Sequence, residues 1–303
     1  LAIDPNYTKT ITNKGNTLDD LGKHQEAITW YDKALAIDGN YSIALNNKGL
    51  TLNKLGKYQE AITWLDKALA IDGNDTGAMK NKGVALALLG KYEDAITWFD
   101  KVLAINGSDT DTLTSKGSAL DDLGKHEEAI TWYDKALAID ANEIITLYNK
   151  GNALSNLGKN EEAMVWYDKA LSIDGNYTNA MVNKGVVLAD LGKYEEAITW
   201  YDKALAINEN NTDALNNKGL VLGNLGRYQE AITWFNKALN QMQSSESSIG
   251  LDLDILSNKA YILGIDLKDY NNALSLTKEY LKKNPEHKGL LCVTVEIYDE
   301  TGY

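Results

Sequence analysis

This sequence of 303 residues has a single cysteine, Cys292, and only two prolines. One cysteine excludes an intrachain disulfide and a thiolate metal cluster. Positive charge is also scarce, because 30 Lys and Arg residues stand against 43 Asp and Glu residues, for a net charge of −13. So acidic a chain disfavours nucleic acids and anionic membranes as partners, and it leaves basic or neutral peptides as ligands.

Long apolar runs and enzyme motifs are missing as well. The longest apolar run, at 84–89, is far too short to span a bilayer. No P-loop, HExxH, CxxC or GxSxG motif occurs, so the sequence predicts no catalytic site, no cofactor and no metal. His24 and His126 occupy the place that Tyr58 holds in another stretch of similar sequence, which predicts a packing role for both.

What the sequence does contain is a strict repeat of 34 residues. The string LGKYEEAITWYDKALAI at 191–207 recurs with small changes, and the other copies begin at Leu21, Leu55, Leu89, Leu123, Leu157 and Leu225. A fixed period of this length is the signature of stacked supersecondary units. The repeat therefore overrides chain length, which alone would suggest about two domains.

One repeat, 42–75, shows how each copy is built. Apolar residues recur at helical spacing over 45–55 and again over 58–69. Gly56 separates the two segments, as a glycine does at the end of a helix. Ser42 is the expected N-cap of the first helix. The repeat is therefore predicted to be two antiparallel helices joined by a tight turn.

These residues resemble the tetratricopeptide repeat, a family with a 34-residue pattern of small and large slots. The matching residues of one copy are Gly49, Gly56, Tyr58, Ala61, Leu65 and Ala68, and the resemblance covers 8–245. It implies an all-α fold, a right-handed superhelical solenoid of antiparallel helix pairs. Gly49 and Ala61 would lack bulk where two helices approach closely.

The repeat divides the chain as follows. Residues 1–7 match the end of a truncated preceding repeat, and seven repeats follow at 8–41, 42–75, 76–109, 110–143, 144–177, 178–211 and 212–245. Residues 246–287 form a degenerate repeat, and the polar stretch 241–248 at its start is predicted to be a loop with an insertion. Residues 288–303 fit the first helix of a further or capping repeat. The chain thus reads as a piece of a longer array, and its open ends predict end-to-end self-association.

The first helices depart from the family pattern by carrying lysine where leucine is usual. These lysines are Lys14, Lys48, Lys82, Lys116, Lys150, Lys184 and Lys218. A lysine in an apolar slot needs a partner or a route to water. The second helices offer an aspartate at a fixed place, at Asp32, Asp66, Asp100, Asp134, Asp168 and Asp202. We therefore predict lysine–aspartate pairs within or between repeats.

All seven tryptophans share one slot of the second helix, at Trp30, Trp64, Trp98, Trp132, Trp166, Trp200 and Trp234. An aromatic residue at that regularity predicts packing within or between repeats and not a ligand cage.

The resemblance also indicates a binding face, because first helices line the concave side of tetratricopeptide arrays. One inward slot holds Asn13, Asn47, Asn81, Asn149, Asn183 and Asn217. Asparagine is a mediocre helix former, and its amide offers the donor and acceptor that a peptide bond needs. Neighbouring inward slots vary and include Asp121, Asp122 and Tyr148. This pattern predicts gripping of a peptide backbone with local side-chain reading; the alternative is an amide ladder that braces adjacent helices.

The sequence thus predicts a protein–protein interaction scaffold that is not an enzyme and binds an extended peptide in its concave groove. The acidic pairs Asp19–Asp20 and Asp121–Asp122 are expected to be exposed, and the second pair favours basic side chains in the ligand. Other parts of the face favour apolar side chains. Two further classes stay open: a regulatory or structural segment of a larger enzyme or sensor, and an array that assembles through its open ends.

Overall fold

The computed structural model describes residues 5–242, 249–282 and 284–302. These residues form seventeen α-helices and one π-helical turn, with no strand among them. The predicted fold class, all-α with consecutive antiparallel helix pairs, is confirmed. The chain divides into two compact halves, Leu1–Leu157 and Gly158–Tyr303, which are described separately.

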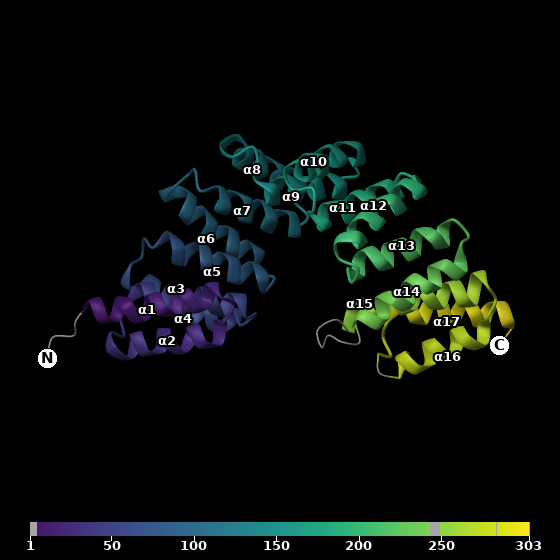
Figure 1. The fold of residues 1–303 in the computed structure, drawn as a ribbon, viewed down its shortest axis with the longest axis horizontal. Coiled ribbons are helices and arrows are strands. Elements are labelled where there is room, and N and C mark those ends of the chain that lie inside the picture. The colour runs from purple at the N-terminus through teal and green to yellow at the C-terminus, as the bar shows by residue number, and fades with distance from the viewer. Residues whose placement is uncertain (1–4, 243–248, 283, 303) are drawn as a thin grey trace. The chain divides into compact units, whose positions relative to one another are not determined.

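The N-terminal half contains four helix pairs and one further helix (Figure 1). First helices alternate with second helices in the order α1 (Pro5–Asp20), α2 (His24–Ile37), α3 (Ser42–Lys54), α4 (Tyr58–Ile71), α5 (Thr76–Leu88), α6 (Tyr92–Ile105), α7 (Thr110–Asp122), α8 (His126–Ile139) and α9 (Ile144–Asn156). Each helix packs against the next one in the chain, so the pairs stack in sequence order.

The C-terminal half continues the alternation and then becomes irregular. It contains α10 (Asn160–Ile173), α11 (Thr178–Asp190), α12 (Tyr194–Ile207), α13 (Thr212–Asn224), α14 (Tyr228–Met242), α15 (Ile249–Tyr261), the π-helical turn η1 (Ile262–Asp266), α16 (Tyr270–Leu281) and α17 (Lys288–Thr301). Helix α17 packs on both α15 and α16.

Glycines in the left-handed conformation end the regular first helices. Their φ angles lie between 72° and 75° at Gly22, Gly56, Gly90, Gly124, Gly158, Gly192 and Gly226. At the end of α3, the Gly56 N–H donates to the Asn53 carbonyl at 3.0 Å and the Lys57 N–H donates to the Leu52 carbonyl at 2.9 Å. These are the two bonds of the Schellman motif, which satisfies the last carbonyls of a helix. The prediction that Gly56 ends the helix is confirmed.

The predicted N-cap is wrong by one residue. Ser42 is the first helical residue of α3, and Thr76 is its equivalent in α5. Asp75 precedes α5, and its side chain accepts a hydrogen bond from the Ala78 N–H at 3.0 Å. Equivalent caps precede α7, α9 and α13, at Asp109, Glu143 and Asn211. The capping side chain must come from the last non-helical residue. That residue lies one position before Ser42 in α3 and one position before Thr76 in α5.

The two helices of a pair approach closely at a glycine of the first helix. A Cβ atom at Gly117 would lie 2.5 Å from Cε1 of Tyr133, a ring that is 1% exposed. The same crowding occurs at Gly15, Gly49, Gly83, Gly185 and Gly219. The expectation that Gly49 and Ala61 permit close approach is confirmed, since Leu65 fills the space above Gly49 and Ala61 is fully buried.

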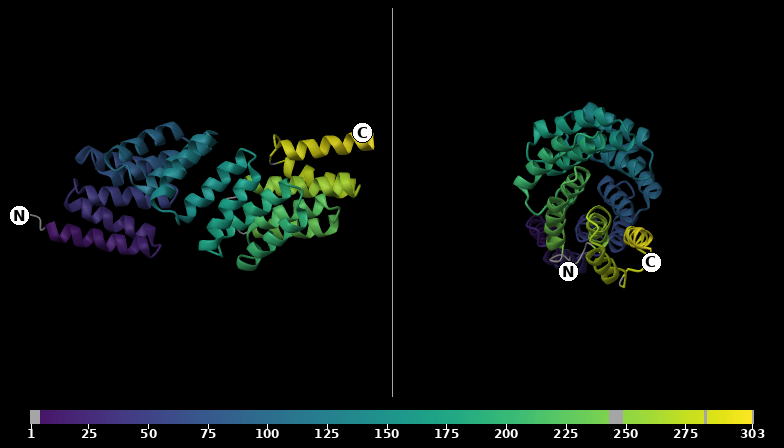
Figure 2. Two further views of the ribbon diagram at one scale, coloured as in Figure 1. Left: turned by 90° about the horizontal axis from the view of Figure 1, so that it is seen from above. Right: turned by 90° about the vertical axis from the view of Figure 1, so that its right-hand side faces the viewer.

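Figure 2 shows the helices of each half stacked side by side in chain order, and the first helices form the more closely packed layer. They contact one another in the pairs α1–α3, α3–α5, α5–α7, α7–α9 and α11–α13. Among the described residues, successive second helices make no comparable contacts. The stack in each half therefore curves with its first helices on the inner side. We call this side the first-helix face.

The degenerate repeat contains one extra residue in its first helix. From Asn258 to Tyr270 the chain is one residue longer than from Asn217 to Tyr228, the equivalent stretch of the preceding repeat. The π-helical turn Ile262–Asp266 absorbs this residue. A π turn does so because its hydrogen bonds span five residues instead of four.

The geometry of this turn shows how the insertion is accommodated. The Leu267 N–H donates to the Ile262 carbonyl at 2.9 Å, five residues back. Lys268 then adopts φ 54° in the place that Gly226 holds in the preceding repeat. Left-handed backbone is uncommon for a residue with a side chain, so this turn is held by its surroundings and not by local preference.

The outer boundaries of the proposed division differ in detail. Helix α1 begins at Pro5, three residues before Thr8, where the sequence places the first full repeat. Residues 1–4 lie outside the described part of the chain. Helix α14 continues to Met242, inside the predicted insertion at 241–248, and the remainder of that insertion is not described. The division into repeats remains one made from the sequence.

Replacing Gly117 by alanine is expected to lower the free energy of unfolding by about 1–3 kcal/mol, because the new methyl overlaps the buried Tyr133 ring. Gly107→Ala is the matched control. Its Cβ would lie 3.5 Å from the Leu103 carbonyl, and its φ is outside the left-handed region, so the change should be neutral or stabilising by about 0.4–1 kcal/mol. Urea denaturation of both variants measures the difference, and equal losses would contradict this account of the helix pair.

Candidate functional site

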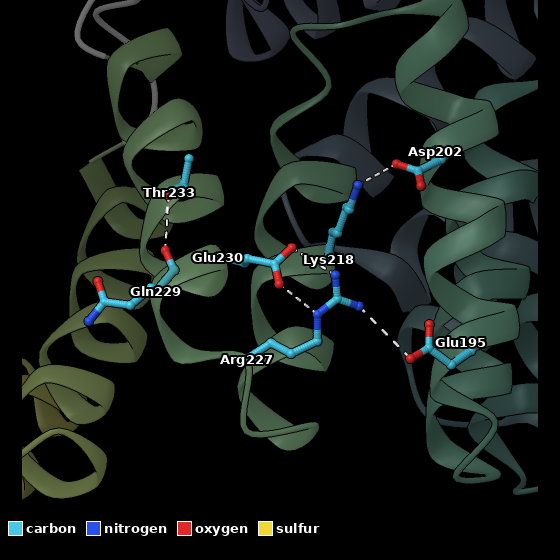
Figure 3. Close-up of polar contacts among 7 residues, drawn as sticks. All are labelled: Glu195, Asp202, Lys218, Arg227, Gln229, Glu230 and Thr233. Atoms are coloured by element: carbon cyan, nitrogen blue, oxygen red, sulfur yellow. Dashed lines mark hydrogen bonds and ion pairs between the residues drawn. The ribbon is translucent and has the colours of Figure 1, made fainter.

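The lysines of the first helices bind carboxylates. In six repeats the ammonium group donates to the aspartate on the second helix of the preceding repeat, in the pairs Lys48–Asp32, Lys82–Asp66, Lys116–Asp100, Lys150–Asp134, Lys184–Asp168 and Lys218–Asp202. Figure 3 shows the last of these pairs. The predicted lysine–aspartate pairing is confirmed, and it joins one repeat to the next.

The same lysines lie on tryptophan rings. The Lys116 ammonium is 3.8 Å from the centre of the Trp132 ring, and the Lys135 ammonium is 3.6 Å from it. Two lysines also flank Trp30, Trp64, Trp98, Trp200 and Trp234, and Lys169 lies over Trp166. Aromatic faces attract cations. The packing role predicted for the tryptophans is confirmed, and their contact with lysine is an addition that the sequence did not predict.

The degenerate repeat shows what happens when these partners are missing. Asn236 of the preceding repeat stands where six repeats carry the aspartate, and Leu276 stands where the tryptophan would be. Lys259, the equivalent lysine, has no carboxylate partner in the part of the chain that the structure describes. Burial lowers the pKa of Lys259. The regular contact between repeats therefore stops at this repeat.

Several asparagines of the predicted peptide-binding row bond to neighbouring first helices. Nδ2 of Asn47 donates to Oδ1 of Asn16 at 2.8 Å, and Nδ2 of Asn81 donates to Oδ1 of Asn46 at 2.9 Å. Two further donations of this kind run from Asn149 to Ser118 and from Asn258 to Asn216. The amide ladder, the alternative interpretation of this row, is therefore present.

The oxygen atoms of these amides are left over. Among the described residues, Oδ1 of Asn47, Asn81 and Asn149 accepts no hydrogen bond, and all three side chains are half-buried. The other predicted members differ: Asn13 is exposed in α1, Asn183 is half-buried in α11, and Asn217 accepts from Nδ2 of Asn216 at 3.5 Å. The row thus combines a braced donor with a free acceptor at three positions of the N-terminal half.

The predicted acidic residues lie at the end of α7, and Tyr148 is half-buried in α9. Asp121 is 2.6 Å from Nδ1 of His126, while Asp122 is exposed. Partial burial of the Asp122 carboxylate and the charge of Asp121 raise the pKa of Asp122. Of these two aspartates, Asp121 has a hydrogen-bonded neighbour in His126, whereas Asp122 has no such partner among the described residues.

Asp111, in the first turn of α7, also has a cationic neighbour. Lys80 lies 3.1 Å from Asp111 and 3.7 Å from Asp109, so its charge offsets theirs. The acidic character of this part of the face therefore rests mainly on Asp122.

Asp19 is buried, and the expectation that it is exposed was wrong. It is 6% exposed and hydrogen-bonds to Lys54 at 2.6 Å and to His24 at 2.7 Å. Burial opposes its charge, but the hydrogen bonds from Lys54 and His24 outweigh burial and lower the pKa of Asp19. His24 and His126 thus each bind an aspartate, and the signal in the sequence is an aspartate five residues before each histidine.

Two other kinds of site find no support in the described residues. No group of three or more His, Cys, Asp and Glu side chains is placed there to hold a metal ion. None of the helices described has the length and apolar content required to cross a membrane.

Stacked antiparallel helix pairs with a polar first-helix face define a helical-repeat protein of the binding-scaffold class. Tetratricopeptide repeat models match residues 6–74, 40–106, 144–177 and 212–241, and a TPR repeat model matches 117–158 and 185–226. These matches together cover more than half of the chain, and the chain belongs to the tetratricopeptide repeat family. This membership supports a role as a protein-interaction scaffold, a class whose members are typically not enzymes.

Solved structures agree with this fold, although no curated protein sequence matches the chain. A tetratricopeptide repeat protein from Parabacteroides merdae is 17% identical with a TM-score of 0.69, over 83% of this chain and 98% of that one. A double mutant of MamA is 24% identical with a TM-score of 0.50, over 57% and 97%. YrrB, a TPR protein with an unusual peptide-binding site, is 24% identical with a TM-score of 0.47, over 62% and 97%. At these identities the first two likenesses concern the fold alone, and the third supports no conclusion.

Asp100→Asn is expected to lower the free energy of unfolding by about 1 kcal/mol, because Lys116 loses its carboxylate partner. The loss is modest since the Asp100 side chain is 52% exposed. Asp94→Asn, at an exposed position of the same helix, should change stability by less than about 0.5 kcal/mol. A double-mutant cycle with Lys116→Met isolates the pair, and a coupling energy of zero would show that it contributes nothing.

The Asp19 cluster predicts a pH dependence. A carboxylate whose pKa is lowered on folding stabilises the protein above its unfolded pKa of 3.8, and this stabilisation is lost as pH falls through the lower folded pKa. The difference in melting temperature between the wild type and Asp19→Asn should therefore be largest near about pH 6 and shrink towards about pH 3. Asp20→Asn, which changes the exposed neighbour, is the control. A difference that stays constant over this range would argue against the cluster.

Proposed function

We propose that this array binds an extended segment of a partner protein along the first-helix face of its N-terminal half. The observation that carries the proposal is the set of unused amide oxygens at Asn47, Asn81 and Asn149. Peptide N–H groups are the donors that such oxygens accept. In the N-terminal half, the row predicted from the sequence, which also includes Asn13, places an asparagine in every repeat except the one that has Ser115 in its place.

The internal bonds of the row favour this use. Each of the three amides already donates to an adjacent first helix, so its orientation is set before a ligand arrives. A preorganised acceptor loses less conformational entropy on binding than a free side chain. Bracing and binding are therefore compatible, because they use opposite ends of the same amide.

The energy of one such bond is small. A hydrogen bond contributes roughly 1 kcal/mol net, which a single asparagine cannot convert into useful affinity. Several consecutive repeats must therefore engage the ligand together. This requirement fits a long array better than an isolated helix pair.

Side chains between the asparagines would select the ligand sequence. Exposed apolar residues on inward positions of the N-terminal half include Ile43, Leu88 and Ile145, which are 51–55% exposed. Asp122 is the carboxylate available to a basic side chain, with Asp121 behind it. We therefore infer a ligand of mixed apolar and basic character, in agreement with the net charge of −13.

Selection of random peptides by display against the intact chain tests the proposal. The variant Asn47→Ala/Asn81→Ala/Asn149→Ala should bind the selected peptides on the order of 100-fold more weakly, because three backbone bonds are lost. N-methylation of individual peptide amides should weaken binding at the positions that face the row. Selected peptides that tolerate methylation everywhere would exclude gripping of the backbone.

The matched control breaks the same bonds from the other side. Asn16→Ala/Asn46→Ala/Ser118→Ala removes the acceptors of all three donations and leaves the row intact. The control should have the lower melting temperature, because Asn16 and Ser118 also accept hydrogen bonds from the buried hydroxyls of Tyr31 and Tyr133. It should nevertheless retain most of the affinity. If both lose affinity equally, the row serves only to brace the helices.

A further inference from the structure

A pocket of about 340 Å³ opens on the C-terminal half where the last regular repeat meets the degenerate one. Helices α13, α14 and α15 and the π-helical turn all contribute to it. The residues that matter for its chemistry are Leu220, Asn224, Tyr228, Asn258, Tyr261 and Asp266.

The pocket exists because the repeat pattern changes at this point. Tyr261 occupies an inward slot that holds no aromatic residue in any other repeat, where it is Asn16, Leu50, Val84, Ser118, Asn152, Val186 or Leu220. Directly after Tyr261, the extra residue of the degenerate repeat converts the helix into the π turn that ends at Asp266. Such single π turns are frequent at functional sites.

The walls of the pocket are apolar and aromatic. Leu220 is 36% exposed and Tyr261 is 43% exposed, so both present apolar surface to solvent, and Ile262 lies buried between them and the core. Tyr228 adds a second ring. These surfaces suit the methylene stem of a long side chain.

The polar groups of the pocket favour a cation. Asp266 is the charged residue of the lining, and its charge together with burial raises the pKa of the Tyr228 phenol. Asn258 uses its Nδ2 to donate to Asn216 at 3.3 Å, which leaves its oxygen as an acceptor. The pocket thus combines a carboxylate, an amide oxygen and two aromatic rings, all of which attract positive charge.

Two cations that neighbour the lining residues in the sequence, Arg227 and Lys268, are engaged elsewhere. Arg227 hydrogen-bonds to Glu230 and lies 3.9 Å from Glu195 (Figure 3). Lys268 lies 3.9 Å from Glu300. Within the described residues, the negative charge of Asp266 therefore has no ionic partner.

We propose that this pocket accepts a lysine or arginine side chain of a partner polypeptide that lies on the first-helix face of the C-terminal half. The methylene stem packs on Leu220 and Tyr261, and the cationic head lies by Asp266 and the tyrosine rings. The inference rests on the proposed function in one respect: the side chain belongs to a polypeptide bound on the first-helix face. A purely apolar side chain would desolvate Asp266 without compensation.

The test uses small probes, so that it does not depend on peptide selection. The intact chain is titrated with N-acetyl-lysine amide and, as the uncharged control, N-acetyl-norleucine amide, while ring signals of Tyr228 and Tyr261 are followed by NMR. The lysine probe should shift both signals and the norleucine probe should not. Asp266→Asn should weaken the lysine probe about tenfold. Asp266→Glu, which keeps the charge, should retain binding.

Asp299→Asn is the charge-matched control, because it removes one exposed carboxylate of the same half outside the pocket. Loss of binding in this variant, or equal shifts with both probes, would overturn the cation pocket. So would a lysine probe that leaves both tyrosine signals unchanged. These outcomes leave the asparagine row untouched, whereas failed peptide selection with lysine-probe binding intact would overturn the proposed function alone.

Discussion

The stacking of this protein depends on a lysine that reaches out of one repeat into the one before it. Lys116 lies on α7, bonds to Asp100 on α6 and rests on the Trp132 ring of α8, so one side chain joins three helices. A leucine in this slot could pack against any apolar neighbour. A charge buried among apolar groups, in contrast, is stable only next to a group of opposite charge. Because the contact recurs at the repeat spacing, each repeat is held by its neighbour, as expected of a one-dimensional array.

This arrangement keeps the lysine–aspartate pairs distinct from the asparagine row of the first-helix face. Lysines and aspartates neutralise one another beside the tryptophans, and the inward row is left with neutral amides. An amide has two ends, and here the donor end ties adjacent first helices together. The acceptor end at Asn47, Asn81 and Asn149 is then already oriented, so using it would lose little conformational entropy. Under the proposed function, one residue type thus serves both the stability of the stack and the recognition of a partner.

The degenerate repeat shows that irregularity has its own consequences. With Asn236 and Leu276 in place of aspartate and tryptophan, the directional contact between repeats is lost, and Lys259 is left half-buried. The repeat also accommodates an extra residue as a π turn and holds Lys268 in a left-handed conformation. The surface that results is unlike that of any other repeat. A scaffold built from nearly identical copies can discriminate between ligands chiefly where a copy deviates.

The sequence by itself determined the helix pairs, the glycine turns and the lysine–aspartate contacts, because a 34-residue period places the same residue types in the same surroundings each time. Only the tertiary structure decided the roles of Asp19, of the amide donors and of Tyr261. Asp19 reads as solvated charge until Lys54 of the next repeat lies 2.6 Å away. The amide donors find Asn16, Asn46 or Ser118 according to what the adjacent helix offers. Such outcomes depend on side chains brought together from different repeats, and periodicity alone cannot show which of them will meet.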